Sequence, residues 1–163
     1  MDYFNCFNLP KNFEIDKKKL LKKYYSLQKK YHPDMNIQCS KKKKKENLKK
    51  SIYINQGYQI LKKNFTRIQY LLKINGFDIK SKENNNILDK KFLYKQYKYY
   101  EKLDQLKKKK NQKKILNFTK KIQLLLNEYK KKIIIQLKKK SWKNAFIILQ
   151  KIIFLKNFTK KMK

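Results

Sequence analysis

The sequence is poor in the residues that most often build catalytic and metal sites. It contains one histidine, His32, and two cysteines, Cys6 and Cys39. These three residues have no metal-ligand spacing and cannot build an ordinary Cys/His zinc site. Around the histidine there is no serine, cysteine or carboxylate constellation of the kind that nucleophilic or acid–base catalysis requires. We therefore expect no metal, no cofactor and no enzymatic activity, and we expect free thiols in a reducing compartment.

Long hydrophobic runs are also missing. The longest apolar stretches, such as AFIIL at 145–149, are far too short to span a bilayer. The N-terminal sequence MDYFNCFNLP has an acid at position 2 and lacks a basic or long apolar leader, so it predicts neither a secretory signal nor a transit peptide. We expect a cytosolic protein.

Glycine and proline are scarce, with two of each, and valine is absent. Apolar residues recur at helical spacing over long windows, and no sustained alternation indicates strands. The chain length allows one or two small domains with modest cores. The sequence therefore predicts an all-α protein.

The first half predicts a helical hairpin. A helix capped by Asp16 ends at Pro33, because proline disfavours helical angles in the residue before it and cannot donate a backbone hydrogen bond. A second helix is expected from about Ser40 and packs antiparallel to the first. The expected apolar stripes are Leu20, Tyr24, Leu27 and Tyr31 on the first helix, and Leu48, Ile52, Tyr58 and Leu61 on the second.

A short third helix is expected over 65–74, ended by the C-cap signal Asn75–Gly76. The polar, Asn-rich segment 77–88 is the expected linker. Three further amphipathic windows follow, and their stripes need one another to leave water, so they predict a three-helix bundle. The stripes are Phe92, Tyr99, Leu103 and Leu106; Ile115, Phe118, Ile122, Leu125, Tyr129 and Ile133; and Trp142, Ala145, Leu149 and Ile152.

The net charge of +35 ordinarily suggests a nucleic-acid or anionic-membrane partner. However, every basic residue except Arg67 is lysine, Ala145 is the only alanine, and residues with AT-rich codons dominate. This pattern indicates compositional drift, so the charge says little about partners. A small basic helical protein that binds RNA or DNA stays open as an alternative, although no recognition-helix signature, zinc finger or aromatic single-strand platform supports it.

The His32–Pro33–Asp34 sequence stands at the break between the two hairpin helices. One interpretation is an ordinary surface loop in which aspartate after proline forms a turn. The combination is more specific than its parts, because a basic amphipathic helix precedes the break and a helix of matching length follows it. Together with MDYFNCFNLP, INQGYQIL, RIQYLL and NGFDI, and with FLYKQY, SWKNA and FLKNF in the second half, the pattern resembles the HscB family of J-type co-chaperones over nearly the whole chain.

The resemblance implies a J-domain over 1–76, a linker over 77–88 and a scaffold-binding three-helix domain over 89–163, in an L-shaped, monomeric protein. It also implies two partners: an HscA-type or DnaK-class chaperone whose ATPase this chain stimulates, and the iron–sulfur scaffold protein IscU. The residues implied to bind the chaperone are His32, Pro33, Asp34, Lys22, Lys23, Lys29 and Lys30. Physically, Asp34 offers a carboxylate for a charge-assisted bond, and the lysines favour encounter with an acidic surface.

The residues implied to bind the scaffold are Leu93, Tyr97, Lys98, Glu101, Gln105 and Phe154. Four of them recur at steps of four and share a helix face apart from the expected core. The alternative is that Leu93 and Phe154 merely widen the core stripe. Relatives carry several glutamates along this face, whereas lysine or glutamine stands at 95, 98 and 105.

Arg67 is the exception in a chain that uses lysine everywhere else. The planar guanidinium makes fixed, multidentate bonds to a carboxylate or to helix-end carbonyls, which an ammonium reproduces poorly. We expect a structural role in locking the short third helix to the hairpin or to the second domain, with Asp2 and Asp78 as candidate carboxylates. Survival of one arginine by chance is the alternative.

Overall fold

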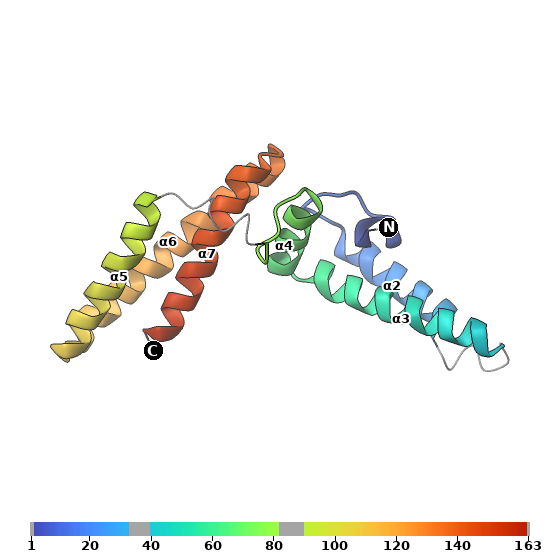
Figure 1. Ribbon diagram of the computed structural model, residues 1–163, viewed down its shortest axis with the longest axis horizontal. Helices are drawn as coiled ribbons and strands as arrows, with labels where there is room; N and C mark the ends of the chain where they lie inside the picture. The colour runs from blue at the N-terminus through green and yellow to red at the C-terminus, as the bar shows by residue number, and fades with distance from the viewer. Residues whose placement is uncertain (1, 33–39, 82–89, 163) are drawn as a thin grey trace. The chain divides into compact units, whose positions relative to one another are not determined.

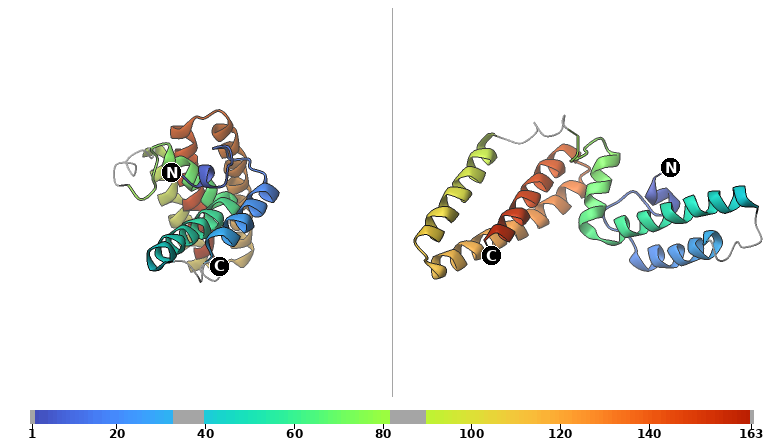
Figure 2. Two further views of the ribbon diagram at one scale, coloured as in Figure 1. Left: turned by 90° about the vertical axis from the view of Figure 1, so that its right-hand side faces the viewer. Right: turned by 60° about the horizontal axis from the view of Figure 1, so that its bottom comes forward.

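The computed structural model describes residues 2–32, 40–81 and 90–162, and the regular structure in these ranges is entirely α-helical (Figures 1 and 2). The fold divides into two compact units, Met1–Ile74 and Asn75–Lys163. The predicted all-α fold class is confirmed.

The first unit is built on the hairpin of α2 (Lys17–Tyr31) and α3 (Lys41–Lys62), which lie side by side (Figures 1 and 2). The Asp16 carboxylate caps α2 by accepting from the backbone N–H groups of Lys18 and Lys19 at 2.8 and 3.0 Å. Ser40 caps α3 by accepting from the N–H of Lys43 at 3.5 Å. Both predicted helix starts are confirmed.

The predicted inward stripe of α3 was wrong at two positions. Leu48 and Ile52 are 46% and 48% exposed, whereas Asn47 and Ser51, one residue earlier in each case, are buried. One residue is about 100° around a helix, so the buried face at these two positions is turned by that angle from the predicted one, whereas Tyr58 and Leu61 are buried as predicted. The seam with α2 is partly polar, because Ser51 Oγ donates to Gln28 Oε1 at 3.2 Å. A search for apolar stripes passes over such a face.

Two shorter helices complete the first unit. The helix α1 (Tyr3–Cys6), which we did not predict, packs on α3 where Gly57 leaves room for the Tyr3 ring. The helix α4 (Asn64–Ile74) follows α3 and ends as predicted before Gly76, whose φ of 90° lies in the left-handed region. The largest buried side chains of this unit are Phe4, Phe7, Leu20, Leu61, Leu71 and Leu72.

The second unit contains α5 (Lys90–Lys108), α6 (Gln112–Lys138) and α7 (Trp142–Lys161). The helices α6 and α7 form the most extensive pair and α5 packs against α6 (Figure 1). The predicted three-helix arrangement is confirmed. Phe77, at the start of the predicted linker, rests its ring 5.6 Å from that of Phe146 on α7. The largest buried side chains are Phe146, Phe158, Ile122, Ile133, Leu149 and Leu155.

Three helices end in the same turn without glycine. After α1, α5 and α6 the chain places Asn8, Lys110 and Lys140 at φ of 51°, 46° and 54°. In each turn the N–H of the following residue donates to the carbonyl five positions earlier, as in Leu9 N–H to the Phe4 carbonyl at 2.9 Å, which is the 6→1 bond of the Schellman pattern. Lysine fits the left-handed conformation less well than glycine or asparagine.

Candidate protein-binding surfaces

The helix α2 presents a basic face to solvent. The four lysines implied to bind a chaperone, Lys22, Lys23, Lys29 and Lys30, are all exposed. The helix contains no acidic residue, and two of these lysines occupy its last turn, where positive charge is favourable beside the C-terminal end of the helix dipole. The sequence therefore builds a stable helix whose positive charge is available to an acidic partner.

The break after α2 lies where the sequence predicted it. His32 is the C-cap residue, with extended angles of φ −62° and ψ 136°, as expected for a residue before proline. Its N–H donates to the Gln28 carbonyl at 2.8 Å, so the histidine directly continues the last turn. His32 is exposed. Pro33 and Asp34 lie outside the described residues.

A polar network holds the end of the hairpin together. Tyr24 Oη and Gln28 Nε2 both donate to Asn55 Oδ1 at 2.8 Å. The Tyr24 ring also stacks on Tyr58 with 4.1 Å between centroids. These bonds fix α2 against α3 near its basic face. The sequence analysis missed Gln28, Ser51 and Asn55. Gln28 follows the stripe residue Tyr24 by four positions, and Ser51 and Asn55 are four positions apart on α3, so the residues of each pair share a helix face.

The outward face of α5 carries the other predicted surface. Leu93 and Tyr97 are 49% and 63% exposed, and Gln105 is exposed as well. Lys98 Nζ lies 2.8 Å from Glu101 Oε2, and this hydrogen-bonded pair raises the pKa of Lys98. Lys98 also lies over the rings of Tyr94 and Tyr97, at 5.6 and 5.8 Å from their centroids. Tyr94, absent from the prediction, therefore extends the exposed aromatic surface.

Phe154 occupies a different environment from Leu93. It is half-buried on α7, and its ring lies 5.7 Å from Phe92, 5.9 Å from Tyr100 and 5.7 Å from Phe158. The side chain thus belongs to an aromatic cluster between α5 and α7, which agrees with the core alternative for this residue. The same alternative does not describe Leu93, whose side chain faces solvent.

Arg67 is 3% exposed, and its guanidinium serves three acceptors. Its Nε donates to the Phe13 carbonyl at 2.8 Å, Nη1 to the Leu61 carbonyl, and Nη2 to Asn64 Oδ1 at 2.9 Å. The predicted carboxylate partners were therefore wrong, and the helix-end carbonyls were the correct alternative: Leu61 stands in the last turn of α3. Asp2 instead pairs with Lys11 at 2.6 Å.

The guanidinium carbon of Arg67 also lies 5.2 Å from the centroid of the Phe13 ring. Burial lowers the pKa of this arginine. One side chain thereby ties α4 to the end of α3 and to the segment that leads into α2. It orients the hairpin without touching the exposed face.

Within the described ranges no group of three or more histidine, cysteine or acidic residues is placed to hold a metal ion. Over the same ranges, no helix has the length and apolar character needed to cross a bilayer.

Comparison with known proteins identifies the family. No family model matches the chain. A protein of Buchnera aphidicola subsp. Acyrthosiphon pisum (strain Tuc7), named co-chaperone protein HscB, is 41% identical over 155 residues, which cover 94% of this chain and 88% of that protein. The chain belongs to the HscB co-chaperone family.

Solved structures agree with the HscB assignment. The chaperone HscB from Vibrio cholerae superposes with a TM-score of 0.73 at 26% identity, over 99% of this chain and 95% of that one. The human co-chaperone protein HscB gives a TM-score of 0.77 at 25% identity, over 99% and 80% of the two chains. The family resemblance seen in the sequence is confirmed, and with it the co-chaperone class.

Proposed function

We propose that this chain is the J-type co-chaperone of an iron–sulfur cluster assembly system. It binds an IscU-type scaffold protein, delivers it to an HscA-type or DnaK-class chaperone, and stimulates the ATPase of that chaperone. The observation that carries the proposal is the exposed basic face of α2 ending directly in His32, in a chain of the HscB family. In this proposal the chain acts as a cytoplasmic monomer and hydrolyses nothing itself.

The chaperone side of the proposal uses His32 with Pro33 and Asp34. The helix α2 is fixed to α3 by the Asn55 network, so its basic face and the histidine move as one body. Such an arrangement favours fast encounter with an acidic surface, followed by contact of the His–Pro–Asp sequence. The assignment of Pro33 and Asp34 rests on the family resemblance.

The experiment is a steady-state ATPase assay of the DnaK-class chaperone of the same organism, with and without this chain and its scaffold protein. The wild-type chain should stimulate turnover. His32→Gln and Asp34→Asn should each abolish stimulation while keeping the far-ultraviolet helical signal and scaffold binding. Stimulation by either variant at the wild-type level would remove the J-domain assignment. Tight, salt-sensitive binding of RNA or DNA without ATPase stimulation would support the nucleic-acid alternative.

The scaffold side uses the outward face of α5. Leu93 and Tyr97 present apolar and aromatic surface next to the Lys98–Glu101 pair, a combination that fits an interface centre with a polar rim. Calorimetric titration of the scaffold should show affinity falling by about tenfold or more for Leu93→Ala, as truncation of a desolvated anchor does. Leu116→Ala, at a comparably exposed leucine on α6, is the matched control and should bind normally.

A further inference from the structure

A depression lies beside the basic face of α2, where the turn after α1 meets the helix. It has a volume of about 290 Å³. Two chain segments line it: Phe7 and Asn8 after α1, and Lys19, Lys22, Lys23 and Ser26 of α2. The four α2 residues follow one helix face at steps of three, one and three. The basic face is therefore not flat, and one wall of the depression is formed by residues outside α2.

The wall formed by the turn after α1 is held in place from several sides. Asn8 occupies the left-handed position of the Schellman turn, with its N–H donating to the Asn5 carbonyl at 3.1 Å. Phe7 is 2% exposed and forms the apolar floor. The turn is therefore a fixed feature of the surface.

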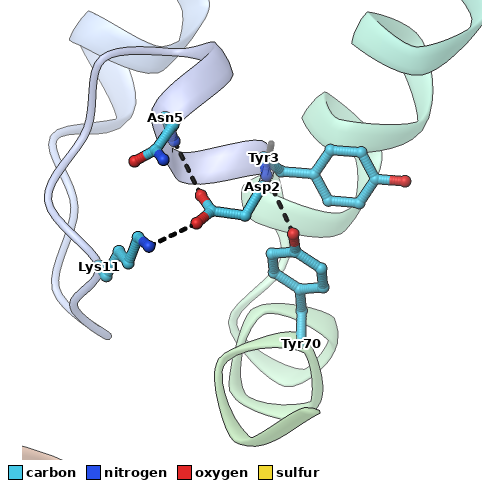
Figure 3. A network of polar contacts seen from close by, with 5 residues as sticks. All are labelled: Asp2, Tyr3, Asn5, Lys11 and Tyr70. Carbon is cyan, nitrogen blue, oxygen red and sulfur yellow. Dashed lines mark hydrogen bonds and ion pairs between the residues drawn. The ribbon is translucent and has the colours of Figure 1, made fainter. Parts of the chain in front are cut away.

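The start of α1 is anchored as well (Figure 3). Tyr70 Oη on α4 accepts from the N–H of Tyr3 at 2.9 Å, and the Asp2 carboxylate accepts from the N–H of Asn5 at 2.9 Å and pairs with Lys11. These bonds fix the start of α1 against α4 and Lys11.

The charge in the depression is positive. In the part of the chain that the structure describes, no ion pair involves Lys22 or Lys23. Lys23 also lies near the turn after α1: burial raises the pKa of the Cys6 thiol, and the charge of Lys23 partly opposes that rise. Three ammonium groups, one hydroxyl and one carboxamide thus surround a small space with an apolar floor.

We infer that this depression receives an acidic side chain of the chaperone ATPase, with Asn8 and Ser26 completing the site around the lysines. The inference rests on the proposed function and deepens it, because the N-terminal segment becomes part of the docking surface. A carboxylate has about four acceptor positions, which ammonium, hydroxyl and amide donors can fill together. The low-dielectric floor strengthens these charge-assisted bonds relative to bonds at a flat surface.

The test measures the concentration of this chain that gives half-maximal ATPase stimulation of the DnaK-class chaperone. Asn8→Gly is the sharpest variant, because glycine keeps the left-handed turn and removes only the carboxamide. It should raise the half-maximal concentration about threefold, and Lys19→Gln together with Lys23→Gln should raise it about tenfold, as loss of bonds to a charged group predicts. Maximal stimulation should stay unchanged.

Two matched controls separate the depression from general effects. Lys49→Gln removes one charge from an exposed position of α3, and Lys110→Gly makes the same left-handed substitution after α5. Neither should move the half-maximal concentration by more than about twofold, as expected of isolated exposed charges. The lysine effect should shrink as salt rises, because exposed charges are screened.

The outcomes are distinguishable. A wild-type chain that fails to stimulate the ATPase overturns the proposed function, and this inference falls with it. A wild-type chain that stimulates, with Asn8→Gly and the double lysine variant unchanged from it, overturns the inference alone. If Lys49→Gln raises the half-maximal concentration as much as the double substitution of Lys19 and Lys23 does, then the chaperone responds to the overall charge of this chain and the depression is not a binding site.

Discussion

Replacement of Arg67 by lysine should destabilise the first unit although charge is conserved. The guanidinium donates in three directions, to the Phe13 carbonyl, the Leu61 carbonyl and Asn64 Oδ1, and is almost wholly buried. A lysine ammonium is a single nitrogen on a flexible stem, so it cannot bond at the same time to three acceptors that lie in different directions.

The magnitude follows from the bonds that lysine leaves unmade. At least one buried acceptor loses its donor, which costs about 1–3 kcal/mol. The planar contact with the Phe13 ring is lost too, which adds about 0.5–1 kcal/mol. We expect the free energy of unfolding of this unit to fall by a total of about 1.5–4 kcal/mol.

Urea denaturation followed by two probes can measure this. Trp142 is the only tryptophan and lies on α7, so its fluorescence reports the second unit, while far-ultraviolet circular dichroism reports both. Arg67→Lys should lower the midpoint of the first unit and leave the Trp142 transition in place. The control Lys49→Arg makes the reverse exchange at an exposed position and should change stability by less than about 0.5 kcal/mol. Equal midpoints for Arg67→Lys and wild type would refute the reasoning.

Three further perturbations test other parts of the structure. In Gly57→Ala the new Cβ would lie 2.7 Å from Tyr3 Cδ1, so α1 must shift. The free energy of unfolding, measured by urea denaturation, should fall by about 1–3 kcal/mol. An unchanged midpoint would contradict the packing of α1. Burial opposes ionisation of Asp2, but its bonds with Lys11 and Asn5 outweigh burial, so its folded-state pKa lies below the ordinary value of 3.8. The stability that Asp2→Asn removes should therefore be present at neutral pH and vanish as the pH falls through that folded-state pKa. A stability difference that is independent of pH would contradict the ion pair. Phe154→Ala should lower the free energy of unfolding of the second unit, followed by Trp142 fluorescence, by about 2 kcal/mol, whereas Leu93→Ala should not. Equal effects of the two variants would mean that the aromatic cluster does not hold α5 to α7.

The helical turns offer a prediction of opposite sign. Lys140 has a φ of 54°, where a side chain with a Cβ is strained and glycine is not. Lys140→Gly should therefore stabilise the second unit by about 1 kcal/mol, seen as a higher Trp142 unfolding midpoint. The substitution Lys131→Gly, at an exposed position inside α6, is the contrasting control and should destabilise by about the same amount. Destabilisation by both would show that the turn does not require the left-handed conformation.

The helices themselves were predictable because their signals are local. Apolar residues at helical spacing, the caps Asp16 and Ser40, and the Asn75–Gly76 ending each act within a few residues of the chain. The exposed lysines of α2 and the break at His32 follow from the same local rules. The family resemblance depended on these features in order along the chain, which no tertiary contact alters.

Tertiary structure alone decided which groups meet. The sequence could state that Arg67 needs several acceptors, but the acceptors are carbonyls that any residue supplies, so composition pointed to the wrong partners. The inward face of α3 turned out to be polar at Ser51 because Gln28 is opposite it, a pairing set by the register of two helices. Phe154 and Leu93 are similar in hydrophobicity, and only packing between α5 and α7 placed Phe154, half-buried, in an aromatic cluster and left Leu93 at the surface. Local spacing fixes an element, whereas partners separated by tens of residues are chosen by how the elements pack.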